Sequence, residues 1–258
     1  MFWRKKPMQY EICVPPIRNS FEEMDHQETE SYFQWHLSVM NERIDYLTSQ
    51  VCAKLAIPRN RMDLSAESLL PLWKWFLSVI EIEETPTEAL QWFWEHDNHP
   101  EPFRAELLKQ RQKQYTLETE MIFQDLGKYL GAVFVHTVPG ISWTYYERPK
   151  SDVWVNMPVL QGFADFQFDP PFIMFFEPVH MAHVQAAKIW DNAQKTEDLL
   201  NLYLMWKQKS IETHGQTFQS VLDKQTKQRL AYGSIRSLRN TNTICKYNTE
   251  ASPSIRKT

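Results

Sequence analysis

Residues 126–147 read LGKYLGAVFVHTVPGISWTYYE, and this stretch is predicted to be the junction between a helix and a sheet around which the domain is built. Before it, apolar residues recur at the spacing of one helix face from Leu117 to Leu130, and Thr116 is the expected N-cap. Gly131 is predicted to take the left-handed position that ends this helix. The period then changes to two, so AVFVHTV, SWTYYE and VWVNMPVL are predicted to be three strands. Short turns such as Pro139–Gly140 between sequential strands favour an antiparallel sheet.

Helical patterns dominate the chain on both sides of these strands. Ser20 and Glu23 are placed to form a capping box for a first helix, and capped or periodic segments follow it as far as residue 130. After the strand candidate FIMFF, two more helices are predicted from Pro178 onward. Strands that are grouped, rather than interleaved with helices, favour an α+β fold over a doubly wound α/β fold.

One α+β domain is therefore expected over residues 1–218. Its parts are a helical region at about 20–130, a small, mostly antiparallel sheet at about 132–176 and C-terminal helices at about 178–218. Residues 219–258 are polar and show little periodicity, and from residue 223 onward they hold eight Lys or Arg against one Asp and one Glu. This composition predicts a basic, flexible tail.

The composition argues against several classes of protein. Only 6 of the 258 residues are glycine, and the motifs GxGxxG, GxxxxGK[ST] and GxSxG are absent, so neither a phosphate-binding loop nor a nucleophile elbow is expected. The 3 cysteines are far apart, which argues against a disulfide scaffold or a zinc ribbon. A net charge of -4 does not indicate a nucleic-acid-binding protein, and only the basic tail is expected to touch nucleic acid weakly.

No segment reads as a signal peptide or as a membrane span. The basic start MFWRKKP is followed by EICVPPIRNS rather than by an apolar run. The longest candidate apolar run, Phe172–Phe176, is far too short to cross a bilayer. We therefore expect a cytosolic protein that has no cofactor and does not contact a membrane, and the sequence leaves its oligomeric state open.

Two HxxH pairs are candidate metal ligands. His180 and His183 lie one helical turn apart, with Glu177 three residues upstream, and this spacing could place ligands for a divalent metal on one helix face. The motif HExxH is absent, and the alternative is a helix start whose histidines pack or face water. The second pair is His96 and His99, in a predicted loop rich in acids, for which an ordinary surface loop is the alternative.

Residues 81–101 are the strongest partner signal in the chain. They hold seven acidic residues and no Lys or Arg, together with three consecutive aromatic residues. Charge steers association and aromatic side chains supply interface hot spots, so such a surface suits a basic partner. The alternative is a solvated face with an aromatic stripe in the core. The predicted partner-binding residues are Glu83, Glu84, Glu88, Trp92 and Trp94, with Trp143 from the predicted sheet.

Two segments together carry a family resemblance. They are DLSAESLLPLWKWF, residues 63–76, and the run from Glu118 through LGKYLGAVFV to Trp143. This order of a capped helix, a helix ending in Tyr-Leu-Gly and a strand leading to a tryptophan resembles small uncharacterised bacterial proteins, over about residues 63–165. Some of those proteins look like immunity proteins encoded beside toxins. The resemblance does not imply any catalytic residue in this sequence.

These observations predict a non-enzymatic, cytosolic interaction protein that binds a partner protein through an acidic and aromatic surface, as an immunity-type inhibitor would. Steric occlusion and electrostatic steering would be its mechanism. Two alternatives remain open. One is a metal-dependent enzyme or metalloprotein that uses Glu177, His180 and His183, and the other is a structural or assembly protein.

Overall fold

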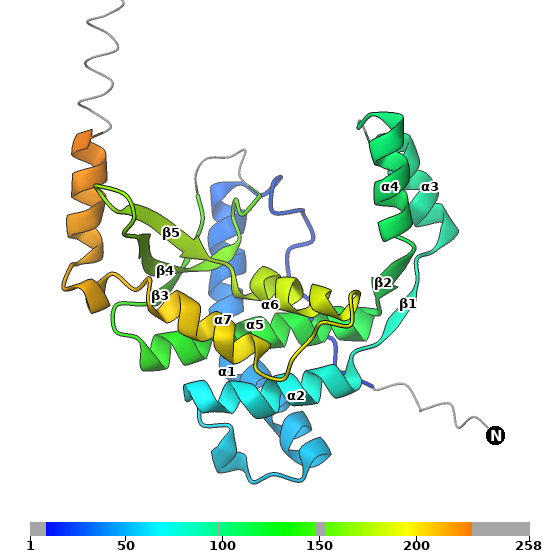
Figure 1. The fold of residues 1–258 in the computed structure, drawn as a ribbon, viewed down its shortest axis with the longest axis horizontal. Helices are drawn as coiled ribbons and strands as arrows, with labels where there is room; N and C mark the ends of the chain where they lie inside the picture. Colours follow the sequence, from blue (N-terminus) through cyan, green and yellow to red (C-terminus); the bar gives the residue numbers. More distant parts are fainter. Residues whose placement is uncertain (1–8, 98, 148–152, 229–258) are drawn as a thin grey trace, which may run out of the picture.

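The computed structural model of the chain describes residues 9–97, 99–147 and 153–228 (Figure 1). Its helices are α1 (His26–Leu55), α2 (Leu69–Val79), α3 (Thr87–His96), α4 (Glu101–Gln110), α5 (Leu117–Thr137), α6 (Pro178–Ala186) and α7 (Asp198–Lys207), with a further helical segment at 218–228. Short 3-10 helices occupy Arg59–Arg61, Ala66–Ser68, Ala187–Ile189 and Glu212–His214. The strands are β1 (Ile82–Glu84), β2 (Lys113–Tyr115), β3 (Ser142–Tyr145), β4 (Pro158–Asp165) and β5 (Phe172–Phe176). None of the described helices combines the length and apolarity needed to cross a membrane.

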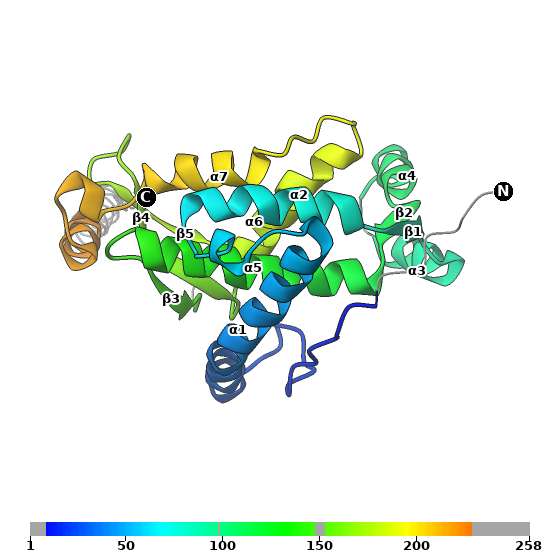
Figure 2. The same ribbon diagram turned by 90° about the horizontal axis from the view of Figure 1, so that it is seen from below.

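Helix α5 is the element around which the body is assembled. It contacts α1, α2, α6, α7 and β3, and Figure 2 shows it running among the other helices. Every residue from 125 to 131 is buried, together with Ile122, Phe123, Val133 and Phe134, so neighbours cover the middle of this helix on all sides. Thr116 caps its first turn, as predicted, because the Thr116 hydroxyl accepts a hydrogen bond from the Thr119 amide at 3.3 Å.

The prediction of a strand at AVFVHTV is wrong, because α5 continues through this segment to Thr137. Gly131 does not end the helix but lies inside it, where the Trp143 ring packs so closely that a Cβ would overlap it. The alternation of valines suggested a strand, yet Leu130, Val133 and Phe134 also continue the helical spacing and are buried. Burial of this helical face outweighs the β propensity of valine.

Replacing Gly131 by alanine should therefore destabilise the protein. Alanine in a helix interior is normally favoured over glycine by about 0.5–1 kcal/mol. Here the added methyl group must displace Trp143, so we expect a net loss of about 1–3 kcal/mol in the free energy of unfolding, measured in urea. A Gly131→Ala protein more stable than the wild type would contradict this packing.

The three-stranded sheet is antiparallel, with strand order β3-β4-β5, and the α+β fold class is confirmed. It begins at Ser142 rather than near residue 132, and residues 153–156 form a turn instead of the start of a strand. Pro139–Gly140 does form a turn, but it joins α5 to β3. The sheet packs on the helices through aromatic side chains: the Phe176 ring lies 5.0 Å from that of Phe134 and 4.7 Å from that of Trp206.

A flexible tail was expected from residue 219 onward. Residues 218–228 instead form a helix, and this helix packs on the sheet. Val221 is buried with Ala164 and Ile211, and the Gln225 amide donates a hydrogen bond to the Pro171 carbonyl at 2.6 Å. The packed body therefore reaches residue 228. The rest of the predicted tail, 229–258, lies outside the described residues.

The first helix begins later than its predicted start at Ser20. Asp25 is the N-cap: its carboxylate accepts a hydrogen bond from the Glu28 amide at 2.9 Å, and the Glu28 carboxylate accepts one from the Asp25 amide at 3.1 Å. The Ser20 carbonyl instead closes a turn with the Glu23 amide at 3.0 Å. Both positions fit the capping-box pattern, and a carboxylate cap is also stabilised by the helix dipole.

A buried ion cluster ties the N-terminal segment to α1 and α5. Arg43 donates to the Asp125 carboxylate at 2.7 Å, and their side chains are only 5% and 1% exposed. The Tyr10 hydroxyl donates to the same carboxylate at 2.7 Å, and the Lys128 ammonium lies 3.5 Å from it. Arg43 also donates to the Glu11 carbonyl at 2.8 Å. One carboxylate thus compensates two buried cations.

Substitution of Asp125 by asparagine should strongly destabilise the fold, since it leaves Arg43 and Lys128 buried without an anion. Removing one partner of a buried ion pair costs about 3–5 kcal/mol. The control is Asp45→Asn, which removes an exposed carboxylate that pairs with Arg59 at 2.6 Å. The control should cost less than about 1 kcal/mol in urea unfolding, and similar losses in the two variants would contradict the proposed role of Asp125.

Strands β1 and β2 form a separate two-stranded antiparallel ribbon, in which Glu83 faces Gln114. The ribbon carries α3 and α4 away from the body (Figure 1). Residues 82–115 are called the arm below. No residue of α3 is buried, and the same holds for the described residues of α4.

Candidate functional site

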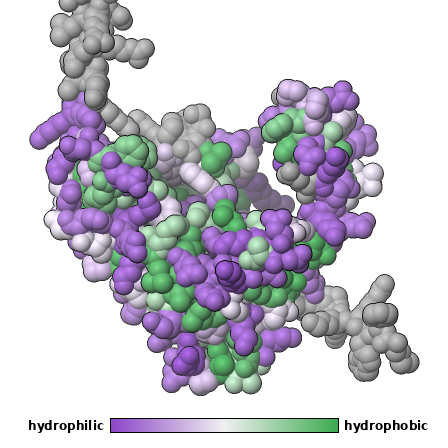
Figure 3. Space-filling model, viewed as in Figure 1, coloured by the Kyte–Doolittle hydropathy of each residue, from purple (hydrophilic) through white to green (hydrophobic). Residues whose placement is uncertain are grey.

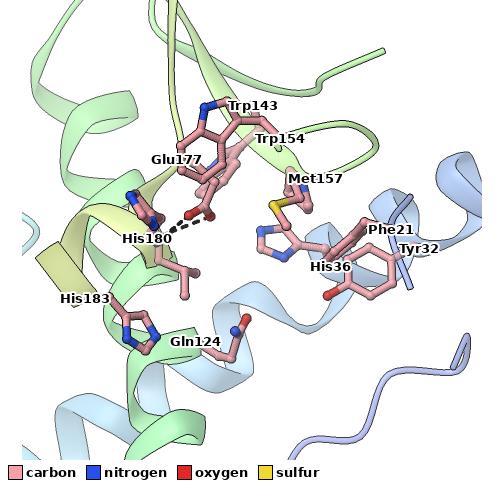
Figure 4. A pocket seen from close by; sticks show the side chains of 12 residues that line it. Phe21, Tyr32, His36, Gln124, Trp143, Trp154, Met157, Glu177, His180 and His183 are labelled. Carbon is pink, nitrogen blue, oxygen red and sulfur yellow. Dashed lines mark hydrogen bonds between the residues drawn. The ribbon is translucent and has the colours of Figure 1, made fainter. Parts of the chain in front are cut away.

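A pocket of about 210 Å³ lies where α1, α5, α6 and the sheet meet (Figure 4). It brings together the first HxxH pair and Trp143, which the sequence had placed in different proposals. Its aromatic wall consists of Phe21, Tyr32, Trp143 and Trp154. Its titratable groups are His36, Glu177, His180 and His183, joined by Tyr32 of the wall.

Two buried polar atoms at this pocket have no hydrogen-bond partner among the described residues. They are Nε2 of His36 and Nε1 of Trp143, whose rings meet edge to face with centroids 4.9 Å apart. Burial, assisted by the positive charge of Lys128, lowers the pKa of His36 to about 3, so this imidazole is neutral at pH 7. Buried polar atoms are normally paired, so these two atoms are an unmet hydrogen-bonding demand on residues that line the pocket.

Glu177 supplies the carboxyl group of the pocket. It is the N-cap of α6, with Pro178 at the first helical position, and its carboxylate accepts hydrogen bonds from the amides of Val179 and His180. Burial raises the pKa of Glu177 to about 7, against the opposing effect of these hydrogen bonds. No Lys or Arg is found among the described residues that line the pocket. The charge of His183 also opposes the rise in the pKa of Glu177, but no Lys or Arg of the described lining pairs with this carboxyl group.

The candidate metal ligands share this pocket but make separate contacts. His183 Nε2 lies 3.2 Å from the Glu120 carboxylate, while His180 is exposed and meets Trp154 edge to face at 4.5 Å between centroids. Glu177 is turned toward the start of its own helix. Across residues 9–97, 99–147 and 153–228, no group of three or more His, Cys, Asp or Glu side chains is arranged to hold a metal ion.

The second HxxH pair is also divided between different neighbours. His96 is the last residue of α3 rather than a loop residue; its ring stacks on that of Trp92 at 4.5 Å, and its Nδ1 lies 2.8 Å from the Trp92 carbonyl. His99 Nδ1 lies 2.7 Å from the Asp97 carboxylate. These contacts fix the tip of the arm.

The predicted acidic and aromatic surface lies on the arm. Glu84, Glu88 and Trp92 are exposed, and Glu88 and Trp92 are one helical turn apart on the same face of α3. Glu83 is also exposed and accepts a hydrogen bond from Gln114 across the ribbon at 2.9 Å. Trp94 differs, because it is half-buried between α3 and α4.

The predicted partner-binding residues therefore fall at two separate places. Trp143 belongs to β3, and Figure 1 shows β3 and the arm on different sides of the body. Trp143 is half-buried in the pocket, so it does not extend the surface that Glu84, Glu88 and Trp92 form.

The pocket itself was not predicted from the sequence. One signal was present: His36 lies three residues after Phe33 and four before Met40, so it is a polar residue on an apolar helical stripe. Phe21 had no such signal. It reaches the pocket through a long-range contact, in which the Asn156 amide donates to the Phe21 carbonyl at 2.7 Å.

A scan against protein-family models, a search of curated proteins and a search of solved structures each found no match to this chain. The resemblance to bacterial immunity proteins therefore stays a prediction.

The low pKa of His36 predicts a pH-dependent stability. The folded pKa is about 3, and the unfolded value is about 6.5, so the unfolded chain takes up this proton first as the pH falls. His36 thus has no effect above about pH 6.5 and lowers the free energy of unfolding by about 1.4 kcal/mol per pH unit below it.

Urea unfolding of the wild type and of His36→Gln at about pH 7 and about pH 5 tests this, and the wild type should lose about 2 kcal/mol more than the variant. Glu177 has a raised pKa and acts in the opposite direction, but it is present in both proteins and cancels in the comparison. Equal pH dependence in the two proteins would show that His36 is not held neutral.

Proposed function

We propose that this protein is a non-enzymatic interaction protein that uses the arm to bind a basic surface of a partner protein, in the manner of an immunity-type inhibitor in a bacterial cytoplasm. The observation that most supports this is the projection of α3 and α4 from the body without a buried face. Most helical stability in proteins comes from packing of an apolar face, and this pair receives little of it from its own chain. A partner would supply the missing surface.

The charge of the arm supports a basic partner. Residues 82–115 contain seven acidic and four basic residues. Two of the four basic residues are occupied within the arm, because the Arg104 guanidinium lies 4.1 Å from the centre of the Trp94 ring and that of Arg111 lies 4.1 Å from the centre of the Phe93 ring. The carboxylates of Glu84 and Glu88 remain exposed and can attract a basic surface.

Exposed aromatic side chains supply the second requirement of an interface. Trp92 is 62% exposed and Phe103 is 61% exposed, and they lie on α3 and α4 respectively. Figure 3 shows the arm standing clear of the body, with hydrophobic residues among hydrophilic ones. Aromatic anchors of this kind dominate the energy of many interfaces, particularly when a charged rim surrounds them.

The mechanism is binding rather than bond chemistry. Acidic side chains raise the rate of encounter with a basic surface, and burial of Trp92 then slows dissociation. The bulk of the body behind the arm would block access to the surface that the arm covers. This combination of steering and steric occlusion is what an inhibitor requires.

The test uses the triple variant Glu84→Lys, Glu88→Lys, Trp92→Ala. The full chain is immobilised, and proteins captured from a lysate of the encoding cells, together with the purified product of the neighbouring gene, are quantified by mass spectrometry. The wild type should capture a basic protein, and the variant should lose at least about tenfold of that binding. Binding should also weaken as salt is raised.

A matched control reverses two exposed acids on the body and truncates one exposed aromatic residue: Glu42→Lys, Glu67→Lys, Phe168→Ala. It carries the same change in net charge and should capture the partner as the wild type does. Equal losses in both triple variants, or unchanged capture by the arm variant, would overturn the assignment to the arm.

A further inference from the structure

The pocket between α1, α5, α6 and the sheet carries an inference that is independent of the arm. We propose that it binds a small organic ammonium ion that also bears a hydroxyl or carbonyl oxygen.

The aromatic wall of the pocket favours a cation that also carries apolar groups. Phe21, Tyr32, Trp143 and Trp154 surround the space from four different parts of the chain, with Met157 beside them (Figure 4). The faces of aromatic rings attract organic cations, by about 0.5 kcal/mol at exposed sites and about 2 kcal/mol when the cation is desolvated. Alkyl groups on the cation would also gain from contact with this apolar wall.

The pocket contains an acidic group, which favours a cationic ligand. Glu177 provides a carboxyl group, and no Lys or Arg of the described chain lines the space with it. Its two oxygens accept hydrogen bonds from the backbone amides of Val179 and His180. Each carboxylate oxygen keeps a further lone pair that can accept a hydrogen bond from a ligand. His36 remains neutral, and the nearby Lys128 is paired with Asp125. A bound anion would meet Glu177 unfavourably, and a purely apolar ligand would leave the remaining lone pairs of its carboxylate desolvated without a partner.

The size and the unpartnered atoms define the ligand further. A cavity of 150 Å³ binds benzene, so about 210 Å³ suits a molecule of about seven to ten non-hydrogen atoms. The Trp143 indole N–H needs an acceptor, and neutral His36 Nε2 can bind either a donor or an acceptor according to its tautomer. A hydroxyl or carbonyl oxygen on the ligand would provide a partner for these atoms, and choline and tyramine each carry a hydroxyl group at a different distance from the nitrogen.

The experiment titrates choline and tyramine into the full chain by calorimetry and follows tryptophan fluorescence, since Trp143 and Trp154 line the pocket. Each cation is paired with a neutral analogue of the same shape, 3,3-dimethylbutanol for choline and 4-propylphenol for tyramine. At least one cation should bind saturably and at least about tenfold more tightly than its neutral analogue. Phosphatidylcholine vesicles, tested in parallel, distinguish a lipid headgroup from a free amine as the source of the ligand.

Two variants assign the binding to this pocket. Glu177→Gln removes the charge and should weaken cation binding by at least about tenfold, with little effect on the neutral analogue. Gln124→Lys leaves Glu177 and its helix cap in place but adds an ammonium group to the lining, and it should have the same effect. The control Glu120→Gln makes the same charge change outside the pocket, at the carboxylate beside His183, and should bind as the wild type does.

Several results would overturn the proposal. One is the absence of saturable binding of both cations at millimolar concentration. Another is equal binding of a cation and its neutral analogue. A third is cation affinity that survives both Glu177→Gln and Gln124→Lys, with thermal unfolding showing that the variants are folded. None of these results bears on the arm, whose residues do not line the pocket.

Discussion

The body depends on a buried ion cluster that is centred on the carboxylate of Asp125. This carboxylate compensates Arg43 and Lys128 and accepts the Tyr10 hydroxyl, so the N-terminal segment, α1 and α5 are held in one arrangement. His36 lies seven residues before Arg43 and therefore on the same side of α1. Gln124 directly precedes Asp125. The cluster thus also fixes two residues that line the pocket.

The molecule divides its apolar residues between a body and an arm. In the body, α5 is covered by neighbours and aromatic side chains such as Phe134 and Phe176 fill the space between helices and sheet. In the arm, α3 and α4 pack mainly on each other and leave Trp92 and Phe103 exposed. The two proposals follow this division, because the arm offers a surface to a protein and the pocket offers an enclosed space to a small molecule.

Local signals in the sequence were sufficient for the fold class and for several elements. The Thr116 cap, the strands at SWTYYE and FIMFF and the exposure of Glu84, Glu88 and Trp92 agree with the structure. The pattern of AVFVHTV fits both a strand and a continued helix, and the choice follows from tertiary burial of Leu130, Val133 and Phe134 on α5. The pocket could not be predicted, since its residues come from distant segments joined by tertiary contacts.

The arm is held outside the packed body, which leaves the faces of α3 and α4 exposed. Native-state hydrogen exchange, read by mass spectrometry on the full chain, tests this most directly. Amides of α5 should exchange only through global unfolding, whereas amides of α3 and α4 should exchange through local opening and orders of magnitude faster. Protection of α3 and α4 equal to that of α5 would show that the arm is packed against the body, and would contradict the account.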